Sequence, residues 1–168
     1  MAYNGAATNP LGLLPAYQLY APDVYSALVD RFGVKRVFIL SAGWGLIPAS
    51  FLTPYYDITF SALADAWKRR RKEDRYADFC LMGDDGDEII FLGGKEYLPL
   101  FCRLTAPLKG RKRVFFNSSD CPDLPASFTP VRYRTTIRTN WHYQCARDLI
   151  AGKQSVLSPS DWSSRISG

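Results

Sequence analysis

The sequence has little of what a metal site needs. It holds one histidine, and its four cysteines lie about twenty residues apart, with no C-x-x-C pair and no zinc-knuckle spacing. A Walker A pattern and G-x-G-x-x-G are both missing, so ATP and dinucleotide binding have no support. We therefore expect no metal, no cofactor and four reduced thiols.

Long apolar runs are missing as well. No stretch of about 18 apolar residues occurs, which predicts that the protein has no membrane partner. Residues 1–10 lack the basic and apolar segments of a secretory signal, so we expect the protein in the cytoplasm. The 168 residues, 47% of them hydrophobic, are typical of one folded domain and exclude a disordered chain.

Positive charge is concentrated in three short stretches. The net charge is +5, and 13 of the 21 basic residues fall within 68–75, 109–113 and 132–138. Clustered cations favour a polyanion through counterion release, although one such run is often only a solvated surface. Three runs with aromatic residues between them favour a nucleic acid. The predicted phosphate contacts are Lys68, Arg69, Arg70, Arg71, Lys109, Arg111, Lys112, Arg113, Arg134 and Arg138.

Hydrophobic periodicity gives a coarse order of elements. It predicts helices over 22–32, 61–73, 97–104 and, with Asn140 as N-cap, 140–150. Short apolar runs predict strands over 36–40, 88–92, 113–116 and 131–137. This alternation predicts a single α/β domain over 1–168, with a largely parallel central sheet and helices on both faces. Residues 1–15 and 153–168 are expected to be irregular.

Loops after parallel strands are the expected ligand site of such a sheet. Glycines there let backbone N–H groups approach a ligand, and a following helix N-terminus favours an anion. An ordinary tight turn would use the same residue types. The predicted base- or sugar-binding residues of these loops are Ser41, Gly43, Trp44, Gly45, Gly93, Gly94, Asn117 and Ser118.

Two further motifs contain residues that could take part in catalysis or ligand binding. In Pro54-Tyr55-Tyr56-Asp57, the tyrosines could stack on a base or sugar beside a catalytic carboxylate. They could equally fill the gap between loop and sheet, with Asp57 capping the next helix. His142, between Trp141 and Tyr143, could assist a leaving group, because its pKa is easily tuned near neutrality. It could also be a packing residue.

Three blocks in order carry a resemblance to a known family. They are L-P-A-Y-Q-L-Y at 14–20, I-L-S-A-G-W-G-L-I at 39–47 and T-P-Y-Y-D at 53–57. Together they resemble the signature P-A-x-x-L-Y … I-L-S-A-x-x-G-L … P-Y-D of small bacterial proteins related to the YaaA peroxide-stress family. The resemblance covers about a third of the chain. The sequence departs from the signature by an extra tyrosine before Asp57, and it lacks a strand with a polar Cys/Lys ending ahead of Leu14.

The resemblance implies an α/β domain and an association with DNA, and members from anti-phage settings are similar to DNA glycosylases. The leading hypothesis is therefore an N-glycosylase that flips a modified base out of DNA. Asp57 would stabilise the cationic sugar and His142 would help the base to leave. Trp44, Tyr55 and Tyr56 would stack on the base.

Two alternatives remain open at this point. The first is a DNA-binding stress or defence protein without catalysis, which needs the same cations and aromatic rings. The second is an enzyme acting on a free nucleoside or nucleotide, in which the cationic runs are only surface. The salt dependence of DNA affinity distinguishes the nucleoside or nucleotide enzyme from the two DNA-acting proteins. Release of a free base distinguishes the glycosylase from the non-catalytic DNA-binding protein.

Overall fold

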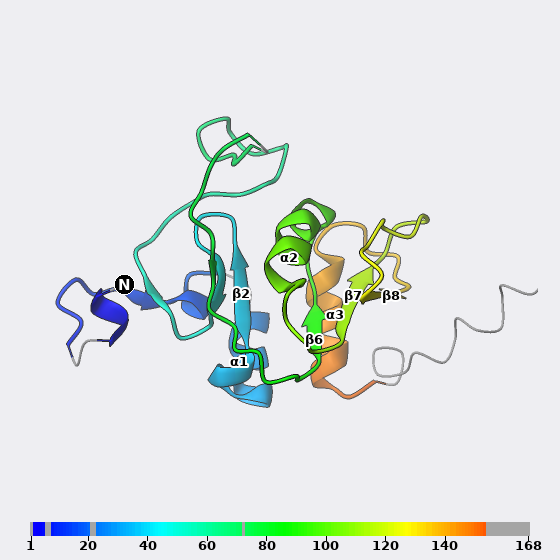
Figure 1. Ribbon diagram of the computed structural model, residues 1–168, viewed down its shortest axis with the longest axis horizontal. Helices are drawn as coiled ribbons and strands as arrows, with labels where there is room; N and C mark the ends of the chain where they lie inside the picture. Colours follow the sequence, from blue (N-terminus) through cyan, green and yellow to red (C-terminus); the bar gives the residue numbers. More distant parts are fainter. Residues whose placement is uncertain (1, 6–7, 21–22, 72, 154–168) are drawn as a thin grey trace, which may run out of the picture. The chain divides into compact units, whose positions relative to one another are not determined.

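The computed structural model describes residues 2–5, 8–20, 23–71 and 73–153 (Figure 1). The chain divides into two compact units. Unit 1 comprises Met1–Asp85 and Glu96–Leu108, and unit 2 comprises Gly86–Lys95 and Lys109–Gly168. Each unit contains helix and strand, so the predicted mixture of helices and sheets is confirmed. The single domain stays a prediction.

The described residues form three α-helices, eight strands and four short 3-10 helices. The α-helices are α1 (Val24–Phe32), α2 (Leu98–Thr105) and α3 (Trp141–Ile150). The strands are β1 (Leu14–Pro15), β2 (Phe38–Ser41), β3 (Gly45–Pro48), β4 (Leu52–Thr53), β5 (Phe79–Cys80), β6 (Ile89–Phe91), β7 (Lys112–Phe116) and β8 (Phe128–Arg132). The 3-10 helices cover Ala2–Gly5, Ala16–Gln18, Val34–Arg36 and Lys95–Tyr97.

Unit 1 is built around the β2–β3 hairpin. The two strands pair antiparallel, and β5 joins β3 in parallel. One side of the hairpin forms a core with Ala16, Ile39, Ile47 and Phe51. Leu46 packs against two leucines of α2, Leu100 and Leu104. Between β4 and β5 the chain makes a long excursion over residues 54–78, whose described residues, 54–71 and 73–78, contain no helix and no named strand (Figure 1).

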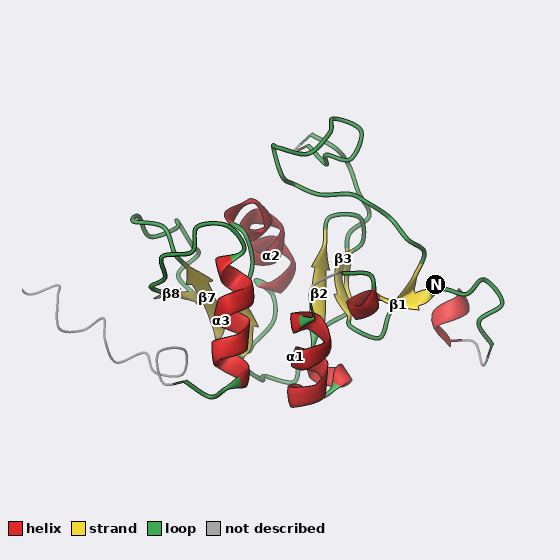
Figure 2. Ribbon diagram, turned by 180° about the vertical axis from the view of Figure 1, so that it is seen from behind, coloured by secondary structure: helices red, strands yellow, loops and turns green. Residues whose placement is uncertain are grey.

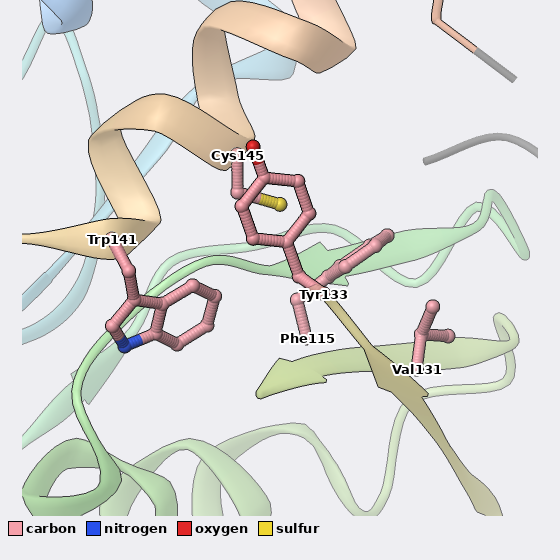
Figure 3. Close-up of a cluster of buried hydrophobic side chains, with 5 residues drawn as sticks. All are labelled: Phe115, Val131, Tyr133, Trp141 and Cys145. Carbon is pink, nitrogen blue, oxygen red and sulfur yellow. The ribbon is translucent and has the colours of Figure 1, made fainter. Parts of the chain in front are cut away.

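Unit 2 is a three-stranded parallel sheet covered by α3. The order is β6-β7-β8, and Phe115 pairs in register with Val131. These two side chains lie on the face that α3 covers with Trp141 and Cys145, which are both buried (Figures 2 and 3). Tyr133 completes this cluster, and its hydroxyl donates to Asp148 Oδ2 at 2.6 Å.

Most predicted elements are present with shifted ends. α1, β2, β6, α2, β7 and α3 all lie within the predicted ranges or one residue beyond them. The fourth strand covers Phe128–Arg132, earlier than the predicted 131–137; Pro130 is tolerated in it because β8 is an edge strand. Asn140 is the N-cap residue of α3, as predicted, but it has φ 58°, a conformation that asparagine tolerates, and its side chain makes no cap hydrogen bond.

Two larger expectations are wrong for the described residues. The strands form three separate sheets and not one central sheet, because the segment expected to be connection folds back as β3 and β4. The helix over 61–73 does not form, and the described residues there make turns and one isolated bridge, at Arg69. Its cations would lie three and four residues apart on a helix, where like charges repel. Within the ranges predicted from the sequence, residues 1, 6–7, 22, 72 and 154–168 lie outside the described part of the chain.

Candidate functional site

The loop after β2 is the turn of a β-hairpin, with Ser41 paired to Gly45. Gly45 has φ +88°, and a Cβ there would lie 2.3 Å from the Phe79 carbonyl oxygen, so only glycine lets β5 approach. The backbone N–H groups of Gly43 and Trp44 both donate to Ser41 Oγ at 3.0 Å. The predicted anion cradle is therefore wrong here: no helix follows the turn, and Ser41 takes these donors.

Ser41 is also the anchor of a chain of hydroxyl groups. Tyr56 donates to Ser41 Oγ at 2.7 Å, and the Tyr20 and Tyr56 hydroxyl oxygens lie 3.0 Å apart. Burial, reinforced by Tyr56, raises the pKa of Tyr20 far above its usual value, so this phenol stays protonated. Ser41 is only 1% exposed. Its proposed contact with a base therefore does not fit the structure.

The three aromatic rings predicted to stack on a base differ in their surroundings. Trp44 packs on Phe51 and Phe79, with ring centroids 6.1 and 6.3 Å apart, as part of the hairpin core. Tyr56 lies edge-on to Trp44 and fills the gap beside the turn. Tyr55, in contrast, is 80% exposed. Only Tyr55 keeps the ring face that stacking needs.

Asp57 pairs with a cation of the first basic run. Lys68 Nζ lies 2.6 Å from Asp57 Oδ2, and both side chains are partly exposed. The hydrogen bond that Lys68 donates to Asp57 outweighs desolvation and raises the pKa of Lys68, so this amine stays charged. The alternative that Asp57 caps a helix is wrong, because the helix expected over 61–73 does not form.

Trp67 joins this pair, and the sequence analysis missed it. Lys68 Nζ lies 4.7 Å from the centroid of the Trp67 ring, which is 77% exposed. Tyr55, which is exposed, precedes Asp57 by two residues. We call Tyr55, Asp57, Trp67 and Lys68 the Asp57 cluster.

Backbone pairing brings the two halves of the Asp57 cluster together. The N–H of Thr59 donates to the Lys68 carbonyl at 2.9 Å, and the N–H of Arg70 donates to the Thr59 carbonyl at 2.8 Å. Residues 59 and 69 thus form a parallel bridge inside the excursion. This bridge explains how Asp57 and Lys68, eleven positions apart, form an ion pair.

Arg70 fixes the excursion to the hairpin. Its guanidinium binds both carboxylate oxygens of Asp78 at 2.6 and 2.7 Å and the Ala42 carbonyl at 2.9 Å. Arg103 also binds Asp78, whose side chain is fully buried. Burial by itself would raise the pKa of Asp78, but the hydrogen bonds from the two arginines lower it below its usual value. Arg70 is therefore a structural residue, and its predicted phosphate contact does not fit.

The structure divides the predicted phosphate-binding cations into buried and exposed residues. Lys112 and Arg113 are buried in β7, and Arg113 pairs with Glu88 at 2.6 Å, so they do not fit a phosphate contact either. Lys68 and Arg69 are partly exposed, and Arg71 is exposed. Of the predicted phosphate contacts in unit 2, Lys109, Arg111, Arg134 and Arg138 are exposed.

The predicted loops of unit 2 do follow the carboxyl ends of parallel strands. Gly93 and Gly94 come after β6, and Asn117 and Ser118 come after β7. Because these strands are neighbours, the two loops share one edge of the sheet. Asn117 Nδ2 donates to the Ile137 carbonyl at 3.4 Å, which ties this edge to the segment before α3.

His142 lies in the first turn of α3. Its ring is edge-on to the rings of Trp141 and Tyr143, with centroids 5.9 and 4.2 Å away. Burial lowers the pKa of His142 below its usual value. Near pH 7 the ring is therefore neutral and can donate or accept a hydrogen bond. His142 belongs to unit 2 and Asp57 to unit 1.

Substitution of His142 separates its two possible roles. If His142 assists the leaving base, His142→Ala should slow single-turnover base release by about tenfold to a thousandfold with the fold retained. A decrease only in step with the folded fraction would leave the packing role.

Since burial lowers the pKa of His142, the wild type should lose stability relative to His142→Ala as the pH falls below about 6.5. Urea unfolding at pH 5 and 7.5 measures this.

Comparisons of the chain with protein-family models, with curated proteins and with solved structures gave no match. The resemblance to the YaaA family therefore stays a prediction. Among the described residues, no group of three or more His, Cys, Asp or Glu gathers to hold a metal ion. No helix in the described ranges is long and apolar enough to cross a membrane.

Proposed function

We propose that this protein acts on DNA and hydrolyses the N-glycosyl bond of a modified base. The observation that carries the proposal is the Asp57 cluster. A carboxylate lies there beside an ammonium group, the exposed Trp67 ring adjoins the ammonium, and the exposed Tyr55 precedes the carboxylate by two residues. Stacking faces, a phosphate-binding cation and a carboxylate are the groups that base excision needs.

Asp57 is the proposed catalytic residue. As the bond between C1′ and the base breaks, its electron pair leaves with the base and the sugar becomes cationic. The Asp57 carboxylate stabilises this charge and takes a proton from the water that adds to C1′. This proton then passes through solvent to the departing base, which leaves as the neutral molecule and returns Asp57 to its carboxylate form. The products are a free base and an abasic site.

Lys68 must release Asp57 for this chemistry. The pair is solvent-exposed, and exposed ion pairs contribute little to stability, so exchange of partners is inexpensive. A DNA phosphate offers Lys68 another anion at the moment of binding. Arg69 and Arg71 lie on the same run and would hold neighbouring phosphates.

Base release is the direct test. The purified protein is incubated with DNA containing modified bases and with unmodified DNA of the same sequence. Free base is measured by chromatography and abasic sites by alkaline strand cleavage. Release that Asp57→Asn removes supports the proposal. Binding without release would assign the protein to the non-catalytic DNA-binding class, and failure to bind any DNA would overturn the proposal.

The exposed cations of the first run give a second prediction. Arg69→Gln/Arg71→Gln should weaken binding to all DNA sequences about equally and reduce the slope of log affinity against log salt by roughly two units. The matched control is Arg31→Gln/Lys35→Gln, which removes the same charge from α1 and the 3-10 helix after it. Titrations from about 50 to 200 mM salt measure the slope. An equal change in both variants would mean that only net charge matters.

A further inference from the structure

We propose that the Asp57 cluster binds an unpaired base, and that the substrate is DNA whose target base is single-stranded or already extruded. The inference rests on the proposed action on DNA and names the form of DNA that this site recognises. Its basis is the pair of exposed rings, Tyr55 and Trp67.

These rings are exposed in spite of a strong tendency to be buried. Aromatic side chains contribute most to the stability of a fold when they are buried, yet Tyr55 is 80% exposed and Trp67 is 77% exposed. Both are held by ordered backbone: Tyr55 follows β4, which pairs with β1, and the turn around Trp67 is closed by the N–H groups of Lys68 and Arg69 donating to the Asp65 carbonyl. The chain thus presents two ring faces on a defined surface.

The groups around the rings suit a single strand. Proteins that bind single-stranded DNA combine aromatic faces for the bases with cations for the backbone. Lys68 adjoins Trp67, and Arg69 and Arg71 continue the cationic run. In a duplex the base faces are covered by neighbouring bases, so Tyr55 and Trp67 would find no partner and only the phosphate contacts would remain.

An anionic lipid surface is the competing partner. Leu63 is 99% exposed and lies four residues before Trp67, and basic residues beside exposed apolar side chains also suit a membrane surface. The ion pair favours DNA: inserting Trp67 into lipid would carry Asp57 and Lys68 toward an apolar phase, where a pair of charges is costly.

Affinity for two forms of one DNA sequence tests the inference. Fluorescence anisotropy with a labelled oligonucleotide, alone and annealed to its complement, should show that Tyr55→Ala and Trp67→Ala each weaken single-strand binding by about tenfold. Duplex binding should change less than about twofold. Tyr55→Phe and Trp67→Phe, which keep a ring, should restore single-strand affinity. Phe32→Ala, which removes an exposed ring beside Arg31 on α1, is the matched control.

The outcomes separate the two proposals. Equal losses on single strand and duplex, or no loss on either, would overturn the inference while leaving DNA as the partner. Failure to bind both forms would overturn the proposed function itself. Trp67-dependent binding to phosphatidylserine vesicles, with unchanged single-strand affinity in Trp67→Ala, would assign the surface to lipid and overturn the inference.

Discussion

Base release by the Asp57→Asn variant should fall by about a hundredfold or more, while DNA affinity and the fold are retained. Asparagine has nearly the shape of aspartate but lacks the negative charge that a cationic sugar requires. A loss of about 3 kcal/mol of transition-state stabilisation is typical for one such electrostatic group. Single-turnover release at saturating enzyme measures the chemical step without the contribution of binding.

Asp65→Asn is the matched control for this variant. Asp65 is the other carboxylate near Lys68, at 3.9 Å, and its side chain is more exposed than that of Asp57. Its substitution removes the same charge from the same surface, so release should change little. Equal losses in the two variants would show a general charge effect, and unchanged release in Asp57→Asn would exclude Asp57 from catalysis.

Arg70→Met should destabilise the protein by about 3–5 kcal/mol, the largest effect on stability that we expect. The substitution removes the bidentate partner of Asp78, whose side chain is fully buried, and leaves Arg103 as its remaining cation. A buried charge that loses its partner is strongly destabilising. The bond to the Ala42 carbonyl is lost as well. Urea unfolding at pH 7 measures the change.

Arg71→Met is the control, because it removes a neighbouring cation whose side chain is exposed. The expected change is about 0.5 kcal/mol or less. Acidification gives an independent measurement. The two arginines lower the pKa of Asp78, so its contribution is present above the unfolded value near 3.9 and is lost as the pH falls through the folded value. In the Asp78→Asn variant, the loss of stability that comes from protonation of Asp78 at low pH should disappear. Equal stability of Arg70→Met and Arg71→Met would contradict the structural role of Arg70.

The basic run shows where a prediction from sequence fails. Lys68, Arg69, Arg70 and Arg71 are chemically alike in the sequence, and all were assigned to phosphates. In the structure Arg70 is buried against Asp78, while Arg71 faces solvent. The bridge between residues 59 and 69 decides which cation points inward. No local pattern encodes this alternation, because the partner carboxylate lies eight positions further along the chain.

The role of the glycines in the turn after β2 also depends on tertiary contacts. A small, glycine-rich loop after a strand favours either a ligand cradle or a tight turn, and the sequence left both open. The close approach of Phe79 to Gly45 settles the second role, since β5 comes from a segment more than thirty residues away. Glycine is required there for space, and the neighbouring N–H groups are taken by Ser41.

The sequence by itself determined the elements with strong local signals. The periodicity of α1, the short apolar runs of β2, β6 and β7 and the last helix were all predicted near their observed positions, because burial of one apolar face fixes such elements locally. Only the tertiary structure decided which polar residues meet. The path of residues 54–78 decides this, because the segment pairs with itself and is bound to the β2–β3 hairpin. It determines the ion pairs Asp57–Lys68 and Arg70–Asp78 and the exposure of Tyr55 and Trp67. Hydrogen bonds between distant backbone groups determine that path, and they cannot be predicted from residue type or spacing.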